Sequence, residues 1–187
     1  MVSISALWLP ILVSAVAVFI VGFIMNMVLP HHRNDFSKVD NEDGFQDALR
    51  SHNLTKGQYF VPYANSSASM KDPDYIKRAE KGPVALVHVI DNGVGPKPQQ
   101  LGIYFVELLI ISLFVAYISG MAFGPGTDYL QIFQIAGSVA VIAHIGALIG
   151  NSVWWGFTWS STFKHMFDGV IYGLVTAGIF GWLWPGM

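Results

Sequence analysis

The chain contains no cysteine, and only 12% of its residues are charged. The missing thiols exclude disulfide bonds, thiolate metal sites and cysteine nucleophiles. A soluble domain normally has about 25% charged residues, so a water-facing surface along the whole chain is excluded as well. The formal net charge of −2 gives no indication of nucleic-acid binding, and we expect no nucleic-acid partner.

Short motifs of several enzyme classes are also missing. The sequence has no Gly-Lys-Ser/Thr phosphate loop, no Gly-x-Ser-x-Gly turn and no His-Glu-x-x-His motif. No inverted repeat relates the two halves, and no apolar run is visibly interrupted, which counts against a self-contained secondary transporter. We therefore predict no catalytic residue and no cofactor, and we lean against an enzyme.

The few charges are concentrated in one segment. All but one of the ten Lys and Arg residues, and nine of the twelve Asp and Glu residues, lie between Pro30 and Gln100. The remainder is almost uncharged, within a chain that is 53% hydrophobic. A polar segment inserted into a membrane bundle explains both facts.

Four apolar runs are long enough to cross a bilayer, for which a helix needs about 20 residues. Backbone polar groups in lipid must be satisfied within the segment, so helices are predicted rather than strands. The first run lacks the basic start and the cleavage site of a signal peptide, and we interpret it as a retained helix. The runs are Ala6–Leu29, Leu101–Phe123, Tyr129–Val153 and His165–Trp184.

These runs predict a membrane all-α protein, a four-transmembrane-helix bundle with a small α+β insertion. The first helix lies in residues 1–30, the extramembrane segment in 31–100 and helices two to four in 101–187.

Four spans place both termini on one side of the bilayer. Every basic residue then lies on the other side, with Arg33, Lys38, Lys97 and Lys164 close to the membrane. The positive-inside rule predicts a bacterial inner-membrane protein with periplasmic termini and a cytoplasmic 31–100 segment.

The extramembrane segment predicts the order helix, strand, helix, strand. Asp40 or Asn41 can cap a helix that runs to about His52. Asp72 followed by a proline predicts the start of the second helix, which Gly82-Pro83 ends. The strands are expected at Gln58–Tyr63 and Val84–Ile90. A core of this size is marginal alone, so we expect the segment to lean on the bundle or on a partner.

Two polar residues lie deep in the apolar runs. At about 1.5 Å per residue, Glu107 in the second run and His144 in the third fall in the same half of the bilayer, as does Asp168 in the fourth. The favoured interpretation is a structural hydrogen bond between Glu107 and His144 that fixes helix register. The alternative is a pair that handles protons or a metal ion.

A membrane-mouth polar cluster is expected on the same face. His32 and Asp35 of this cluster, together with Arg33, could bind a metal, a lipid phosphate or an acidic partner. Adjacent histidine side chains diverge, however, and we do not expect His31 and His32 to point at one ion. The favoured interpretation is therefore a polar cap at the headgroups, with a metal site less favoured. The cluster comprises His31, His32, Asp35, His165 and Asp168.

Small residues recur at four-residue spacing along the last run, which lets helices approach closely. The stripe predicts tight packing inside the bundle or at an oligomer interface. Its members are Gly169, Gly173, Ala177 and Gly181.

Several short motifs resemble those of a group of bacterial inner-membrane proteins that have no established function. The resemblance covers most of the chain and implies a four-helix membrane protein, without any catalytic residue. The motifs are Pro30-His31-His32-Arg33-Asn34-Asp35, Gly57-Gln58-Tyr59, Lys71-Asp72-Pro73, Gly82-Pro83 and Gly181-Trp182-Leu183-Trp184-Pro185.

Three functions remain open from the sequence. The favoured one is an accessory or scaffolding subunit of a larger membrane complex, or a homo-oligomer, with the bilayer and other membrane subunits as partners. The second is a small protein that conducts protons or metal ions through Glu107 and His144. The third is a membrane metalloenzyme.

Overall fold

The computed structural model describes residues 1–186. The chain forms two compact units, one built from residues 1–36 together with the chain from Pro96 on, and one built from Ser37–Gly95. We describe each unit by itself, beginning with the helical one.

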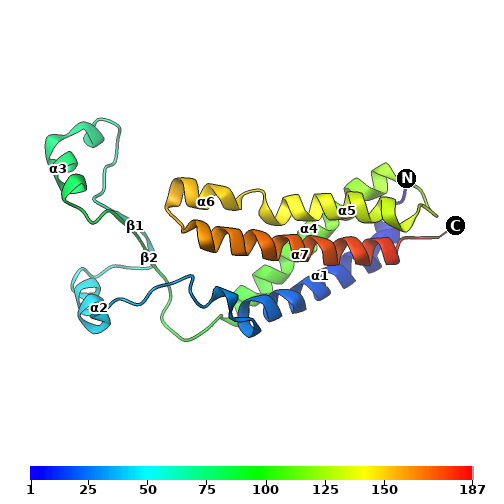
Figure 1. The fold of residues 1–187 in the computed structure, drawn as a ribbon, viewed down its shortest axis with the longest axis horizontal. Coiled ribbons are helices and arrows are strands. Elements are labelled where there is room, and N and C mark those ends of the chain that lie inside the picture. Colours follow the sequence, from blue (N-terminus) through cyan, green and yellow to red (C-terminus); the bar gives the residue numbers. More distant parts are fainter. Residues whose placement is uncertain (187) are drawn as a thin grey trace. The chain divides into compact units, whose positions relative to one another are not determined.

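The helical unit is a bundle of long antiparallel helices that lie side by side (Figure 1). A 3-10 turn, Ile4–Leu7, leads into α1, which a π-helical turn, Ile24–Val28, prolongs. The backbone of Val2 donates to Gly120 (2.8 Å) and that of Gly126 to Pro185 (2.9 Å), so both ends of the described chain lie where α4 ends and α5 begins. The helices are α1 (Trp8–Phe23), α4 (Pro98–Ala122), α5 (Tyr129–Ile145), α6 (Leu148–Trp155) and α7 (Trp159–Trp182).

Three helical segments are long and apolar enough to cross a membrane: Ile4–Val28, Pro98–Ala122 and Tyr129–Trp155. They confirm the first three predicted runs to within a few residues. The fourth run is also a long helix, α7, but it is not among the three. Its first half carries Lys164, His165 and Asp168, and these polar residues reduce its apolar character.

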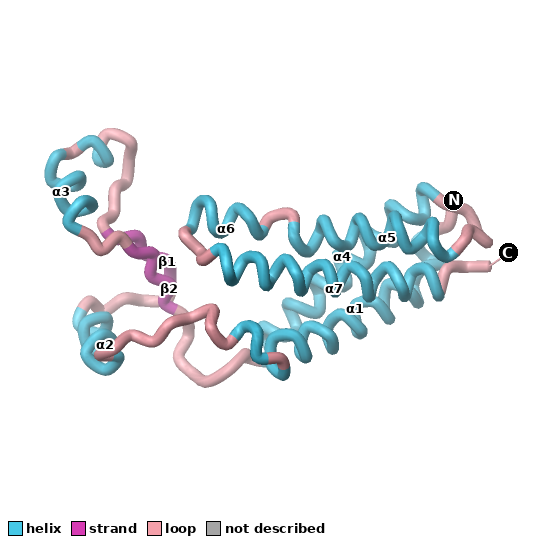
Figure 2. The backbone as a smooth tube through the Cα atoms, viewed as in Figure 1, coloured by secondary structure: helices cyan, strands magenta, loops and turns pink. Residues whose placement is uncertain are grey.

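The third run is interrupted, contrary to the unbroken helix expected from the sequence. α5 ends at Ile145 and α6 begins at Leu148, with Gly146 and Ala147 between them (Figure 2). A Cβ atom on Gly146 would lie 2.7 Å from the carbonyl oxygen of Ile142, so this position requires glycine. Glycine also has a low helix propensity, which favours an interruption here.

α5 and α7 pack closely because small residues line α7. A Cβ atom on Gly173 would lie 2.3 Å from the Val141 side chain, and one on Gly169 would lie 2.4 Å from that of Ile145. Gly181 approaches Tyr129 in the same way, and Ala177 faces Gly137. All four residues of the predicted small-residue stripe therefore face α5 within the same chain.

The Ser37–Gly95 unit has the predicted order: α2 (Glu42–Ser51), β1 (Gly57–Val61), α3 (Pro73–Lys81) and β2 (Ala85–Val89). The strands are antiparallel, with Tyr59 opposite Val87. Both predicted caps are confirmed, since Asn41 accepts from Gly44 N (3.1 Å) and Asp72 accepts from Asp74 N (2.7 Å). No residue between Ser37 and Gly95 is buried, so this unit has no core of its own.

Substituting Gly173 by leucine tests the α5–α7 contact. The added side chain has no space beside Val141, and overpacking of this kind costs about 1–3 kcal/mol. We expect a clearly lower unfolding temperature in detergent. Gly102→Leu is the matched control, because nothing lies within 4 Å of a Cβ atom at Gly102. Equal stability of the two variants would contradict the packing described here.

Candidate metal centre and adjoining cavity

The end of α1 places two histidines beside α7. Its last turn is π-helical and closes with a bond from Leu29 N to Ile24 O (3.0 Å). Pro30 then starts a short 3-10 turn, Pro30–His32. π-helical turns are rare and occur frequently at functional sites.

Both histidines bind the same carboxylate. Nε2 of His31 lies 3.0 Å from Oδ1 of Asp168, and Nε2 of His32 lies 2.8 Å from Oδ2. The Asp168 side chain is only 2% exposed. The expectation that adjacent histidines diverge is wrong here: the 3-10 turn holds their rings 4.1 Å apart, and each ring reaches a different oxygen of one carboxylate.

A second carboxylate supports His32 from the other side. Oδ2 of Asp35 lies 2.6 Å from Nδ1 of His32, and Oδ1 accepts from Nζ of Lys164 at 2.6 Å. His165 stacks on His32 with ring centroids 4.5 Å apart. The structure therefore brings together all five residues of the membrane-mouth polar cluster. The structure adds Lys164 to this cluster. In the sequence, Lys164 was considered only as a basic residue that indicates membrane orientation.

The contacts of His32 define its charge. Both ring nitrogens face carboxylate oxygens, which accept hydrogen bonds, so without a metal these surroundings favour the imidazolium form of the ring. Burial lowers the pKa of His32, but its hydrogen bonds to Asp168 and Asp35 outweigh this and raise the pKa above 6.5. Burial also raises the pKa of Asp35, while the hydrogen bonds from Lys164 and His32 bring it down to about 2.

The raised pKa of His32 predicts how stability depends on pH. A group whose pKa is higher in the folded state stabilises the fold fully below its unfolded pKa, here about 6.5. That contribution is lost as pH rises through the folded value. We expect the unfolding temperature, measured with a chelator present, to fall as pH rises from neutral to about 9.

A His32→Gln variant should lose this part of the pH dependence, because its amide does not titrate in this range. His88→Gln is the control, because His88 is exposed in β2 and should leave the profile unchanged. If the unfolding temperature of His32→Gln depends on pH in the same way as that of the wild type, His32 does not carry the positive charge assigned to it.

The same residues can hold a metal ion. The ligand atoms of His31, His32 and Asp168 all lie within 4.8 Å of one another. Zinc binds imidazole nitrogen and carboxylate oxygen at about 2.0–2.2 Å in tetrahedral geometry, which places donors roughly 3.4 Å apart. The observed separations, 3.0 Å from His31 to Oδ1 and 2.8 Å from His32 to Oδ2 of Asp168, are those of hydrogen bonds, so a metal would replace the Nε2 protons and the donors would adjust around it.

A second set, formed by His32, Asp35 and His165, also meets the distance criterion. In that set the nearest oxygen of Asp35 is 3.9 Å from Nε2 of His165, and the same carboxylate already accepts from Lys164. In the first set, Asp35 instead occupies the place of an outer carboxylate that orients a metal-binding histidine. We therefore assign the first set as the ligands.

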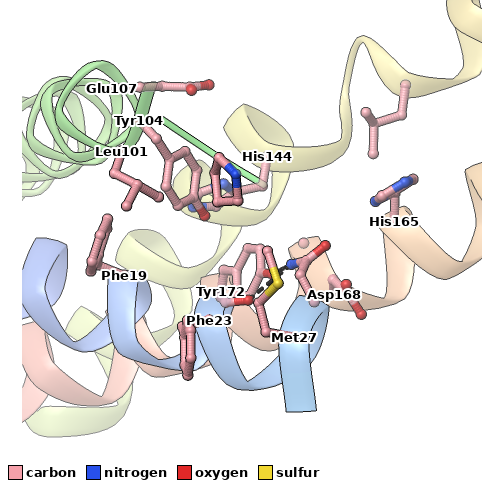
Figure 3. A pocket seen from close by; sticks show the side chains of 15 residues that line it. Phe19, Phe23, Met27, Leu101, Tyr104, Glu107, His144, His165, Asp168 and Tyr172 are labelled. Carbon is pink, nitrogen blue, oxygen red and sulfur yellow. Dashed lines mark hydrogen bonds between the residues drawn. The ribbon is translucent and has the colours of Figure 1, made fainter. Parts of the chain in front are cut away.

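A cavity of about 500 Å³ adjoins the cluster. His165 and Asp168 belong to both, and the other walls come from α1, α4, the α5–α6 break and α7. Figure 3 shows the rings of Tyr104, His144 and Tyr172 gathered at the cavity, with Phe19 and Phe23 on the α1 side.

Glu107 and His144 line this cavity together, yet no hydrogen bond joins them. His144 instead packs edge-on against Tyr172, with ring centroids 5.4 Å apart, and Glu107 is exposed. The expected direct hydrogen bond is therefore not formed. Counting residues gives the position of a side chain along the helix axis, but it does not give the direction around the axis in which that side chain points.

Asn26, a polar residue beside the cavity, was not singled out from the sequence. Nδ2 of Asn26 donates to the Gly22 carbonyl (2.9 Å) and to the Tyr172 hydroxyl (3.2 Å), which links α1 to α7 beside the cavity. The signal was present in the sequence, because Asn26 is the only strongly polar side chain between Ala6 and Leu29.

No family of known proteins, no curated protein and no solved structure matches this chain. The resemblance to bacterial inner-membrane proteins therefore stays an expectation. What the fold and the site define is a class: a helical protein with three helices long and apolar enough to cross a membrane, and a His–Asp cluster around the buried Asp168 beside a cavity. The functional argument rests on that geometry.

Proposed function

We propose that this protein is a membrane-embedded metalloprotein that binds a divalent transition metal through His31, His32 and Asp168. One observation carries the proposal: two adjacent histidines both direct Nε2 at one buried carboxylate. A second carboxylate fixes the other nitrogen of His32. This combination of ligand and outer carboxylate is typical of metal-binding histidines.

Three protein ligands favour chemistry over a purely structural role. Structural zinc sites use four protein ligands, whereas catalytic sites keep a position for water or substrate. A metal there would activate water or polarise a substrate oxygen. Asp168 and His165 also line the cavity, so a substrate in the cavity would lie beside a metal held by these ligands. A membrane metalloenzyme, the least favoured function from sequence alone, becomes the favoured one.

The proposal includes α7 as a fourth membrane span. Its 24 residues are long enough to cross, and its small-residue face packs on α5. Both termini then lie on one side. The basic residues near the opposite face favour a cytoplasmic 31–100 segment and a bacterial inner-membrane location. The metal site would lie near the cytoplasmic face.

Metal titration tests this function. The full-length protein in nanodiscs, stripped with a chelator, should bind one Zn²⁺ per chain by calorimetry and elemental analysis. Asp168→Asn and His31→Gln remove or weaken a ligand and should lower the affinity at least tenfold. Asp35→Asn removes the outer carboxylate and should lower it about 10- to 100-fold.

His52→Gln and His88→Gln are the controls, since both histidines are exposed outside the bundle. Circular dichroism should show that every variant keeps its helix content. Zn²⁺ affinity that is unchanged in a folded Asp168→Asn variant, or equally reduced in the two controls, would exclude the assigned site.

A second candidate function, the accessory subunit, is supported by a separate observation. The Ser37–Gly95 unit has a two-stranded sheet and no buried residue. Isolated two-stranded sheets are marginally stable at best, so a covering surface would stabilise this unit. In this view the unit binds another subunit or a second copy of the chain.

Hydrogen exchange tests the accessory role. Amides of β1 and β2 should exchange at least tenfold more slowly in native membranes than in the purified protein, because a partner would protect the strands. Amides of α4 provide the internal control and should not differ. Equal exchange of the strands in both samples would argue against a bound partner, and native mass spectrometry would separate a homo-oligomer from a mixed complex.

A further inference from the structure

The cavity beside the metal site contains polar groups without protein partners. No described residue forms a hydrogen bond with the Tyr104 hydroxyl, the Glu107 carboxylate or the His144 ring. The Tyr172 hydroxyl accepts from Asn26 but donates to no described residue. Polar groups at membrane depth are costly unless they are paired, and they commonly mark the path of a substrate or ion.

The rest of the wall is apolar and largely aromatic. Phe19, Phe23 and Leu101 contribute to it together with the faces of the tyrosine rings (Figure 3). Phe23 is 60% exposed and Leu101 42%, so apolar side chains continue from the cavity to the surface of the bundle. In a bilayer this surface faces lipid, which gives a lipid-soluble molecule a route of entry.

The charges that line the cavity disfavour an anionic occupant beside Glu107. Glu107 and Asp168 both line the cavity, and no lysine or arginine does. Asp168 is already paired with His31 and His32, whereas a fatty acid or a phosphate headgroup beside Glu107 would meet a carboxylate that no lysine or arginine of the lining compensates. A neutral molecule with carbonyl or hydroxyl groups instead matches the available donors and acceptors: hydroxyls, an imidazole and a carboxylate.

We propose that this cavity binds a neutral, lipid-soluble ring compound that carries carbonyl or hydroxyl groups, of the quinone or quinol type. The flat ring packs among the aromatic side chains of α1, α4 and α7. Its oxygens bind the Tyr104 hydroxyl and the His144 ring, and a ring hydroxyl donates to Glu107. Pockets of this kind, apolar with a few convergent polar groups, are typical small-molecule sites.

The position of the cavity relates the ligand to the metal. Asp168 and His165 belong to the cluster and to the cavity lining, so a ring oxygen at that end of the cavity would lie near a metal held by His31, His32 and Asp168. The role of the ring compound as a substrate rests on the proposed metalloprotein function. Its binding does not, because the groups that hold it are separate from the metal ligands.

Ligand binding is tested with decylubiquinone on the full-length protein in nanodiscs, with a chelator present. We expect a saturable rise in unfolding temperature, as for any ligand that binds the folded state. Tyr104→Phe removes only the hydroxyl and should weaken binding at least tenfold. Glu107→Gln should weaken the reduced, hydroxyl-bearing form more than the oxidised form. Tyr117→Phe is the control, because Tyr117 is exposed on the same helix outside the cavity.

Three results would overturn the inference: no shift with decylubiquinone, an equal shift in Tyr104→Phe and wild type, or an equal shift with oleate, which would identify a fatty-acid site. The two proposals fail separately. Zn²⁺ binding without decylubiquinone binding removes only the ligand assignment. Decylubiquinone binding in a protein that does not bind Zn²⁺ removes only the metalloprotein function and the substrate role.

Discussion

The buried carboxylate of Asp168 is the constraint on which the rest of this structure depends. A carboxylate whose side chain is 2% exposed needs compensating charge and hydrogen bonds, because burial of an unpaired ion costs several kcal/mol. The two histidines that follow α1 provide them, and they bind the end of α1 to α7. Asp35 and Lys164 extend this compensation outward, toward the more exposed end of the cluster. The same donor atoms are the ones that we propose as metal ligands.

The helix packing differs between the two sides of α7. Glycine and alanine bring α7 against α5 with no room for larger side chains, whereas the cavity is lined mainly by residues of α1, α4 and the first half of α7. Large aromatic residues line that space, and Asn26 holds Tyr172 in place across it. The π-helical end of α1 and the break after α5 both occur at this level of the bundle. Local departures from regular helix thus coincide with the candidate site.

Much of the local structure was predictable from the sequence. Asn41, Asp72 and Gly82 fixed the helix ends in the Ser37–Gly95 unit, because capping depends on neighbours along the chain. The small-residue stripe on α7 also indicated a close contact, although not that α5 would be its partner. The break at Gly146 was missed, because a single glycine is tolerated in many helices and only its contact with Ile142 makes it necessary.

The sequence by itself determined which segments are apolar and which residues cap α2 and α3, and it predicted where Glu107, His144 and Asp168 lie along their helices. These properties follow from composition and from the fixed rise of a helix. The sequence did not give the break after Ile145 or the start of α7, which is at Trp159 and not at His165. Only the tertiary structure decided the direction in which each side chain points. Rotation about the helix axis depends on packing between helices, which placed Asp168 against two histidines and left Glu107 and His144 without a direct bond. The candidate site is therefore a product of tertiary packing, built from residues whose positions along their helices were predicted from the sequence.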